Sequence, residues 1–187
     1  MKQYILASSS PRRKALLKLL DIHFEVISPE VDEVLDETRG LEDAIMQLAY
    51  QKAEAVFNTH QEAMVFGFDT LVCIGNQVLG KPKDESEARI MLNLLSDNTH
   101  RVITGCAIIT KEKQQIFYKD AHVTFSKIDK EEIEAYIQTQ EPFGKAGAYA
   151  IQGFGAKFIE TIHGDYYAVM GLPVHEVYKA LKGFAKL

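Results

Sequence analysis

Two adjacent arginines near the amino terminus stand where an anion could be bound. Ser8–Ser10 follow a short apolar run and are followed by Pro11, Arg12 and Arg13. Ser10 suits the N-cap of a helix and Pro11 its first position, which places both arginines in the first turn. Cations there face the positive end of the helix dipole, at a cost of about 0.3–1 kcal/mol each. The pattern predicts either a phosphate-sized site of N–H groups, hydroxyls and guanidinium groups, or two solvated arginines beside a capped helix.

Asp69 and Lys52 are charged residues in apolar stretches of the sequence. Asp69 directly follows the apolar run 63–68, and a carboxylate at the end of a buried strand can reach a cleft. An aspartate that begins a turn is the alternative. Gly67, within the run, would let a backbone or a ligand approach closely. Lys52 falls in the middle of the apolar stripe of a predicted helix over 42–57, so it either extends its ammonium to solvent or answers an anion.

An acidic segment over residues 30–37 could contribute to a metal site. Asp32 and Glu33 are among its carboxylates. Mg²⁺ prefers one or two carboxylates together with waters and phosphate oxygens, and such an ion offsets the negative charge on those oxygens. A solvated acidic loop is the alternative.

A glycine-dense stretch, Gly144–Gly153, matches neither a Walker A motif nor G-x-G-x-x-G. Its small residues would let the backbone approach a ligand. Gln152 carries a hydrogen-bond donor and an acceptor on one amide, a pair that could contact a polar ligand. Lys81 precedes Pro82, which holds it extended between a strand and a turn, and simple solvation is the alternative for that lysine.

Helices and strands alternate in the first part of the chain, and hairpins follow. We therefore expect a mixed α/β sheet flanked by helices, in a single domain over residues 1–187. Asp84 and Glu87 form a capping box before an amphipathic helix ending near residue 95. Strands are predicted over 4–7, 24–27, 64–68, 71–74, 77–79, 101–109 and 115–125, a hairpin over 158–162 and 166–169, and further helices over 129–139 and from Pro173 onward.

The composition narrows the class of protein. The chain has 187 residues, 47% of them hydrophobic, and a formal net charge of −5. A nucleic-acid-binding protein would normally carry a basic surface, so no nucleic-acid partner is expected. No apolar stretch reaches membrane-spanning length and residues 1–7 lack a signal-peptide core, so we expect a cytoplasmic protein with no membrane partner. Cys73 and Cys106 form no C-x-x-C pair, which favours buried, reduced thiols over a disulfide or zinc.

The chain resembles the Maf family of nucleoside triphosphate pyrophosphatases, once linked to septum formation. The similarity runs in the family's order over nearly the whole sequence. The family usually has Asp where Gly144 stands and Gly where Ala150 stands. The matching motifs are Ser8–Arg13, Phe68–Thr70, Leu79–Pro82, Lys145–Tyr149, Gly164–Tyr167 and Gly171–Pro173.

This resemblance implies a fold, an activity and a set of site residues. The fold would be an elongated mixed sheet with two lobes and a central cleft, like inosine triphosphatase. The activity would be hydrolysis of a nucleoside triphosphate to the monophosphate and pyrophosphate, with Mg²⁺ or Mn²⁺ on Glu33 and Asp69. Asp69 would be the proton acceptor for water, acting with Glu33, Lys52 and Lys81. The implied substrate-binding residues are Ser8, Ser10, Arg12, Arg13, Thr70, Lys145, Tyr149 and Gln152.

The resemblance also bears on substrate and partners. The combination of Arg12, Thr70 and Gln152 resembles the subgroup that acts on dTTP and UTP, including modified pyrimidine triphosphates. The family tends to form homodimers, although this sequence carries no dimer signature. A nucleotide-binding regulator of cell division, acting through a protein partner, is the alternative function.

Overall fold

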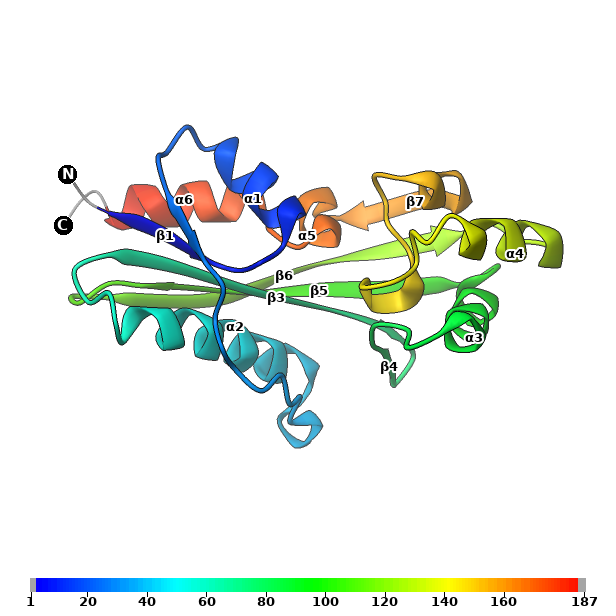
Figure 1. Cartoon of the computed structure of the whole chain (residues 1–187), viewed down its shortest axis with the longest axis horizontal. Coiled ribbons are helices and arrows are strands. Elements are labelled where there is room, and N and C mark those ends of the chain that lie inside the picture. The colour runs from blue at the N-terminus through cyan, green and yellow to red at the C-terminus, as the bar shows by residue number, and fades with distance from the viewer. Residues whose placement is uncertain (1–2, 185–187) are drawn as a thin grey trace. The chain divides into compact units, whose positions relative to one another are not determined.

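The computed structural model describes residues 3–184, apart from the side chain of Glu37, and contains a mixed sheet flanked by helices (Figure 1). The strands are β1 (Tyr4–Ala7), β2 (Glu25–Ile27), β3 (Met64–Ile74), β4 (Gln77–Leu79), β5 (Thr99–Ile109), β6 (Gln114–Phe125) and β7 (Ile159–Gly164). The helices are α1 (Pro11–Lys18), α2 (Leu41–Phe57), α3 (Glu85–Leu95), α4 (Lys130–Gln138), α5 (Tyr166–Met170) and α6 (Val174–Phe184), with 3₁₀ helices η1 (Glu37–Arg39), η2 (Ala146–Ala148) and η3 (Phe154–Phe158).

The described strands form one sheet in the order β2-β1-β3-β5-β6-β7, with β4 paired to β3. β1 runs parallel to both β2 and β3, whereas β4 is antiparallel to β3 and β7 is antiparallel to β6. Ala7 is in register with Ile27 of β2 and Gly67 of β3. The segments that follow these three positions therefore leave the parallel pairing at the same edge, where α/β proteins place their ligands.

The chain divides into two compact units, each with its own hydrophobic core. Unit 1 comprises Met1–Thr70, Thr104–Lys119 and Gly171–Leu187, and unit 2 comprises Leu71–Ile103 and Asp120–Met170. The terminal residues 1–2 and 185–187 of the expected domain lie outside the described residues.

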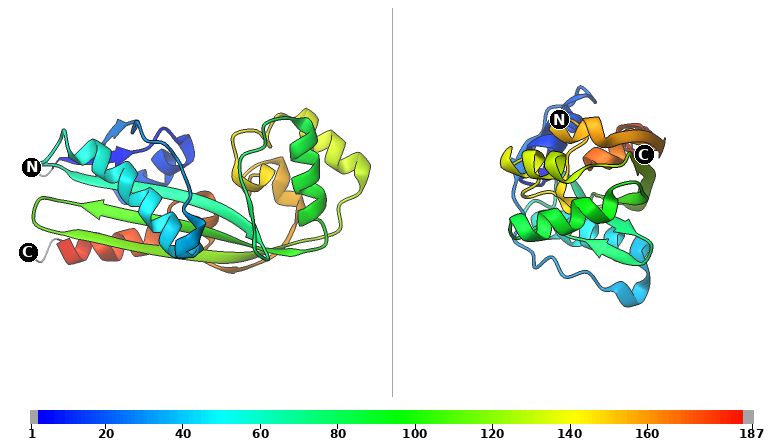
Figure 2. Two further views of the ribbon diagram at one scale, coloured as in Figure 1. Left: turned by 90° about the horizontal axis from the view of Figure 1, so that it is seen from below. Right: turned by 90° about the vertical axis from the view of Figure 1, so that its right-hand side faces the viewer.

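In unit 1, α2 packs closely across β3 and β5 (Figure 2, left). A Cβ at Gly67 would overlap the carbonyl oxygen of Ala49 and lie 2.7 Å from the nitrogen of Ala53. A Cβ at Gly105 would likewise overlap the carbonyl oxygen of Ile45. The close approach predicted at Gly67 is therefore made by the backbone of α2. α1 and α6 cover the opposite face of this part of the sheet (Figure 1).

In unit 2, α3 and α4 lie side by side (Figure 2, left). Both begin at an aspartate: Asp84 accepts a hydrogen bond from the N–H of Glu87, and Asp129 accepts one from the N–H of Glu132, each at 2.8 Å. Half of the predicted capping box is present: Asp84 caps the helix, but the Glu87 carboxylate accepts a hydrogen bond from the N–H of Lys83 rather than from that of Asp84.

Two local predictions were wrong. Asp69 does not follow a strand but lies inside β3, which continues to Ile74 because β4 pairs with its second half. Asp69 is nevertheless just beyond Gly67, where the pairing with β1 ends. The second strand of the predicted hairpin, 166–169, is helix α5. The Asp165 carboxylate accepts hydrogen bonds from the N–H groups of Tyr167 and Ala168 and so caps a helix there.

Two further findings concern membrane-spanning helices and the two cysteines. Among the described residues, no helix has the length and apolar character needed to cross a membrane. Cys73 and Cys106 are both buried and neither forms a disulfide, as the sequence predicts.

Candidate functional site

The serines before α1 hold the backbone at the start of that helix. Ser10 Oγ accepts a hydrogen bond from the N–H of Arg13 at 3.4 Å, which makes Ser10 the predicted N-cap. Ser8 is buried, and its Oγ accepts a hydrogen bond from the N–H of Ser10 at 3.2 Å. Each hydroxyl keeps its proton, so both can still donate to an anion at the positive end of α1.

Arg13 is held by contacts within the protein rather than solvated. Its Nε donates to the carbonyl oxygen of Gly171 at 2.9 Å, and its Nη2 donates to Thr70 Oγ1 at 3.0 Å and lies 4.0 Å from Asp69 Oδ1. Gly171 has φ of +103°, and a Cβ there would press on both Arg13 and Thr70. Burial lowers the pKa of Arg13, and the neighbouring Asp69 raises it. Arg13 therefore stays charged and ties α1 to β3 and to the segment before α6.

Arg12 carries the clearest sign of a missing anion. Its Nε is buried and, in the part of the chain that the structure describes, finds no hydrogen-bond acceptor. Burial lowers the pKa of Arg12, which marks a guanidinium group drawn away from water. A buried donor of this kind is rare and costly, so a phosphate oxygen would supply the partner that the protein does not.

Lys52 forms ion pairs with two carboxylates. It is 6% exposed, and its Nζ lies 2.7 Å from Asp69 Oδ1 and 2.8 Å from Glu33 Oε1. Of the two alternatives, extension to solvent is therefore wrong and an anionic partner is found. Arg13 also lies 4.0 Å from Asp69, so the cluster combines two cations with two carboxylates.

The two carboxylates also fit the coordination chemistry of a divalent cation. Asp69 and Glu33 already meet around one positive charge. No group of three or more His, Cys, Asp or Glu side chains suited to a metal is found within residues 3–184. An ion held here would take its other ligands from water and substrate, which is how Mg²⁺ is usually bound.

Thr104 was not foreseen from the sequence. It is fully buried on β5, and its Oγ1 lies 2.9 Å from Thr70 Oγ1, the atom that accepts from Arg13. Threonine is common in strands for its β-branched shape, so nothing in the sequence distinguishes this hydroxyl from an ordinary strand residue.

Unit 2 carries the remaining predicted residues. The N–H of Gly147 donates to the carbonyl oxygen of Gly80 at 3.1 Å, which brings the segments of Lys81 and Lys145 side by side. Lys81 is exposed, whereas Lys145 Nζ donates to the carbonyl oxygen of Glu141 at 2.5 Å. Unit 1 thus gathers Ser8, Ser10, Arg12, Arg13, Glu33, Lys52, Asp69 and Thr70, and unit 2 holds Lys81, Lys145, Tyr149 and Gln152.

Tyr149 and Gln152 differ sharply in their surroundings. Tyr149 is 5% exposed, and its hydroxyl lies 2.8 Å from Nε2 of the buried His100. Burial raises the pKa of Tyr149 and lowers the pKa of His100 to about 4, so both are neutral near pH 7. Gln152 is exposed on the loop that follows.

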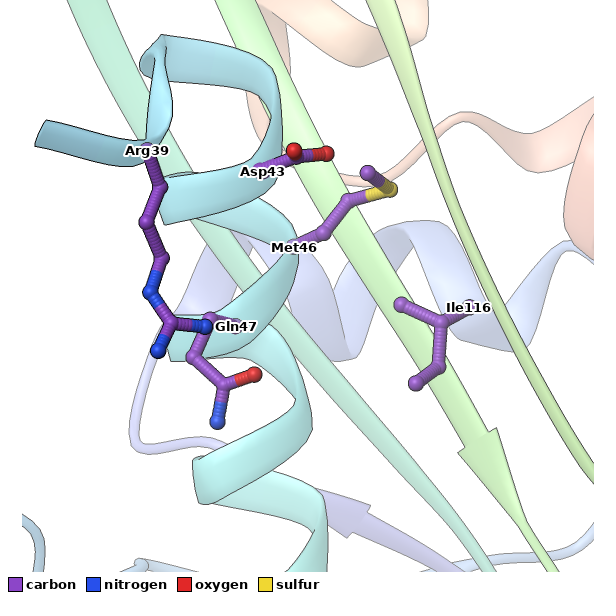
Figure 3. Close-up of a pocket in the computed structure, with 5 residues that line it drawn as sticks. All are labelled: Arg39, Asp43, Met46, Gln47 and Ile116. Carbon is purple, nitrogen blue, oxygen red and sulfur yellow. The ribbon is translucent and has the colours of Figure 1, made fainter. Parts of the chain in front are cut away.

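A separate pocket of about 430 Å³ lies beside α2 in unit 1 (Figure 3). It contains none of the predicted site residues. Arg39, its cation, is 3.1 Å from Asp36, so the pocket lacks an unbalanced charge for a phosphate. Its lining residues are Arg39, Asp43, Met46, Gln47 and Ile116.

The mixed sheet defines an α/β protein, and a cluster of arginine, lysine and carboxylate side chains lies at the edge of its parallel strands. A solved structure with this fold is that of the Staphylococcus aureus Ham1 protein, with a TM-score of 0.57 and 14% identity, covering 97% of this chain and 99% of that one. The chain belongs to the Maf family, whose model, described as Maf-like protein, matches residues 3–184.

Relatives within the family are much more similar in sequence. A Bacillus cytotoxicus protein named dTTP/UTP pyrophosphatase is 51% identical over 184 residues, covering 98% of this chain and 96% of the relative. A Bacillus mycoides protein of the same name is 48% identical over 184 residues, with the same coverage. The expected family and fold class are thereby confirmed.

Proposed function

We propose that this protein is a nucleoside triphosphate pyrophosphatase that converts dTTP and UTP, and modified pyrimidine triphosphates, to the monophosphate and pyrophosphate. Two relatives whose sequences are 51% and 48% identical to this chain, over nearly their full length, carry the name dTTP/UTP pyrophosphatase. The observation that carries the proposal from the structure is the Lys52–Asp69–Glu33 cluster beside two arginines at the start of a helix. It combines a carboxylate able to accept a proton with cations able to hold a polyphosphate.

In the proposed reaction, Asp69 accepts a proton from a water molecule. The water oxygen forms a bond to the α-phosphorus, the bond from that phosphorus to the bridging oxygen breaks, and pyrophosphate leaves. Lys52, Arg12, Arg13 and Lys81 stabilise the charge that develops on the leaving group. Because phosphoryl transfer depends mainly on positioning and electrostatics, a site whose charged groups are already gathered suits it.

Glu33 and Asp69 would hold Mg²⁺ or Mn²⁺ in this proposal. A divalent ion, when bound, offsets negative charge on the phosphate oxygens. Asp69 would serve both as a metal ligand and as the proton acceptor.

The remaining residues are assigned to binding. Ser8 and Ser10 donate to phosphate, and Thr70, Lys145, Tyr149 and Gln152 contact the rest of the nucleotide. An amide at Gln152 that donates to O4 and accepts from N3–H matches uracil and thymine, whereas cytosine reverses both demands. We therefore expect dTTP and UTP to be cleaved much faster than CTP, ATP or GTP.

The proposal takes the partner to be a free nucleotide rather than a nucleic acid or a membrane. It places the enzyme in the cytoplasm, which two reduced thiols suit. A homodimer remains an expectation from the family resemblance.

A panel of canonical and modified triphosphates, incubated with Mg²⁺ or Mn²⁺, tests the proposed function. Release of monophosphate and pyrophosphate, fastest from dTTP and UTP, is the expected result. Nucleotide binding without any pyrophosphate release would instead favour the regulator of cell division. Equal rates for CTP and UTP would contradict the assignment of base choice to Gln152.

A further inference from the structure

An exposed amide can select one nucleotide base only if the protein fixes the orientation of that amide. The amide of Gln152 could rotate to satisfy cytosine as well as uracil, so discrimination depends on what fixes it. Gln152 lies in a short turn between η2 and η3, and no helix or strand holds it directly. The backbone on either side of Gln152 is the part of this loop that the protein can fix.

One carboxylate holds the loop on the carboxyl-terminal side of Gln152. Glu141 Oε2 accepts a hydrogen bond from the N–H of Phe154 at 2.9 Å, and Glu141 Oε1 accepts one from the N–H of Gly155 at 3.0 Å. A Cβ at Gly153 would overlap the same carboxylate. The loop therefore closes directly over Glu141, and a side chain at 153 would displace that carboxylate.

One phenol holds the loop on the other side. Tyr136, on α4, is 2% exposed, and its hydroxyl accepts a hydrogen bond from the N–H of Ala150 at 3.2 Å. The same hydroxyl donates to Glu141 Oε1 at 2.8 Å. Gln152 thus stands in the middle of a segment whose two ends are tied to one connected pair of side chains.

The charge of Glu141 suits this arrangement. Burial opposes its ionisation, but hydrogen bonds from Gly155, Phe154 and Tyr136 outweigh that effect and lower the pKa of Glu141. An ionised carboxylate only accepts hydrogen bonds, and here it faces three donors. A glutamine side chain has one acceptor oxygen and an NH₂ group, so it could not reproduce all three contacts.

We propose that Glu141 and Tyr136 are positioning residues for base selection, which hold the Ala150–Gly155 segment so that Gln152 presents one hydrogen-bonding pattern. The inference rests on the proposed function and adds to it the residues that make Gln152 selective. Neither residue needs to touch the reacting phosphates.

The test compares Glu141→Gln and Tyr136→Phe with the wild-type protein on UTP and CTP. We expect the ratio of kcat/KM for UTP to that for CTP to fall by about 10-fold or more, since a loosened loop can satisfy either base. Pyrophosphate release from UTP should persist. Gln152→Leu gives the ratio expected when the amide is absent. Glu131→Gln, which alters an exposed carboxylate on α4, the helix that carries Tyr136, is the matched control and should keep the wild-type ratio.

Each outcome bears on a distinct claim. A wild-type protein that releases no pyrophosphate contradicts the proposed function itself. If the wild type is selective and the folded variants keep its UTP-to-CTP ratio, the inference is wrong. A uniform loss of activity on both nucleotides, with the ratio unchanged, marks a merely structural role and overturns it equally. Thermal unfolding identifies the folded variants. If Glu141→Gln does not fold, Tyr136→Phe, which removes only one oxygen, tests the proposed positioning role by itself.

Discussion

Lys52 explains how a charged residue can sit on the apolar face of a helix. Its ammonium is buried but lies between the carboxylates of Asp69 and Glu33, so the charge is compensated. Removing one partner of such a cluster leaves the others uncompensated, and that cost is larger than the value of the intact pair. Mutations in this cluster should therefore affect both stability and chemistry, and the two effects must be measured separately.

Asp69→Asn should abolish most of the activity while keeping the fold. The change preserves shape but removes the proton acceptor, so turnover should fall by about 10²–10⁴-fold. Steady-state release of pyrophosphate from dTTP measures this, and thermal unfolding confirms that the variant is folded. Asp32→Asn, which alters an exposed carboxylate beside Glu33, is the control. A folded Asp69→Asn protein with near-normal turnover would remove Asp69 from the mechanism.

Lys52→Met should weaken both folding and nucleotide binding. The apolar side chain fits its surroundings, but the two carboxylates lose their shared cation, so the free energy of unfolding should fall by about 1–3 kcal/mol. Affinity for a non-hydrolysable triphosphate should fall as well, because a phosphate-binding cation is lost. Denaturant titration and calorimetric binding measure the two effects. Unchanged triphosphate affinity would return Lys52 to a purely structural role.

The sequence identifies some of these residues and misses others for a physical reason. Lys52 stands out because a lysine in an apolar stripe needs an explanation. Thr104 and Glu141 do not stand out, because a threonine in a strand and a glutamate after a helix are ordinary. Their importance comes from contacts with Thr70 and with Phe154 and Gly155, which only the folded chain brings together.

Among the elements, α2 and its contact with the sheet position the site. Gly67 and Gly105 let the helix backbone lie against β3 and β5, and Lys52 stands on this face between Ala49 and Ala53. The predicted helix and the close approach at Gly67 are both confirmed. The sequence cannot tell a continuous strand from two short ones at Asp69, because strand pairing depends on distant partners. It likewise missed the capping role of Asp165, because the aromatic run after it also fits a strand.

Gly67→Ala should displace α2 and destabilise the protein. The added methyl group would overlap the backbone of Ala49, and backbone atoms cannot move as a flexible side chain can. We expect the free energy of unfolding to fall by about 1–3 kcal/mol or more, with a loss of activity as Lys52 shifts. Gly183→Ala, on α6 in open space, is the matched control and should be neutral or stabilising. Equal stability of the two variants in denaturant would contradict the close packing of α2.

At the level of the folded chain, stability should depend on pH through His100. Its pKa falls from 6.5 to about 4 on burial, so between these values the unfolded state binds more protons than the folded state. The free energy of unfolding should therefore be highest above pH 6.5 and should fall by about 1–3 kcal/mol as the pH drops to about 4.

His100→Gln should reduce this acid sensitivity, although it also removes part of the contact with Tyr149. Unfolding measured at several pH values gives the slope for each protein. His163→Gln, which changes an exposed histidine on β7, should keep the wild-type slope. A His100→Gln protein as sensitive to acid as the wild type would exclude His100 as the source.

The mixed sheet, most of its helices and strands and the family membership could be anticipated, because periodicity, caps and motifs are local signals. The family resemblance implies two lobes, but the places where the chain passes between the two units could not be located, because three of them fall inside β3, β5 and β6, where the sequence continues as strand. The distribution of the predicted site residues between the units could not be foreseen either.

In the proposed reaction, water attacks the α-phosphorus with Asp69 as proton acceptor. Hydrolysis of UTP in water labelled with heavy oxygen, followed by mass spectrometry of both products, tests this step. We expect the label in the monophosphate and not in pyrophosphate, and we expect Asp69→Asn to slow its incorporation in step with turnover. Label in pyrophosphate, or products that are the diphosphate and inorganic phosphate, would contradict it.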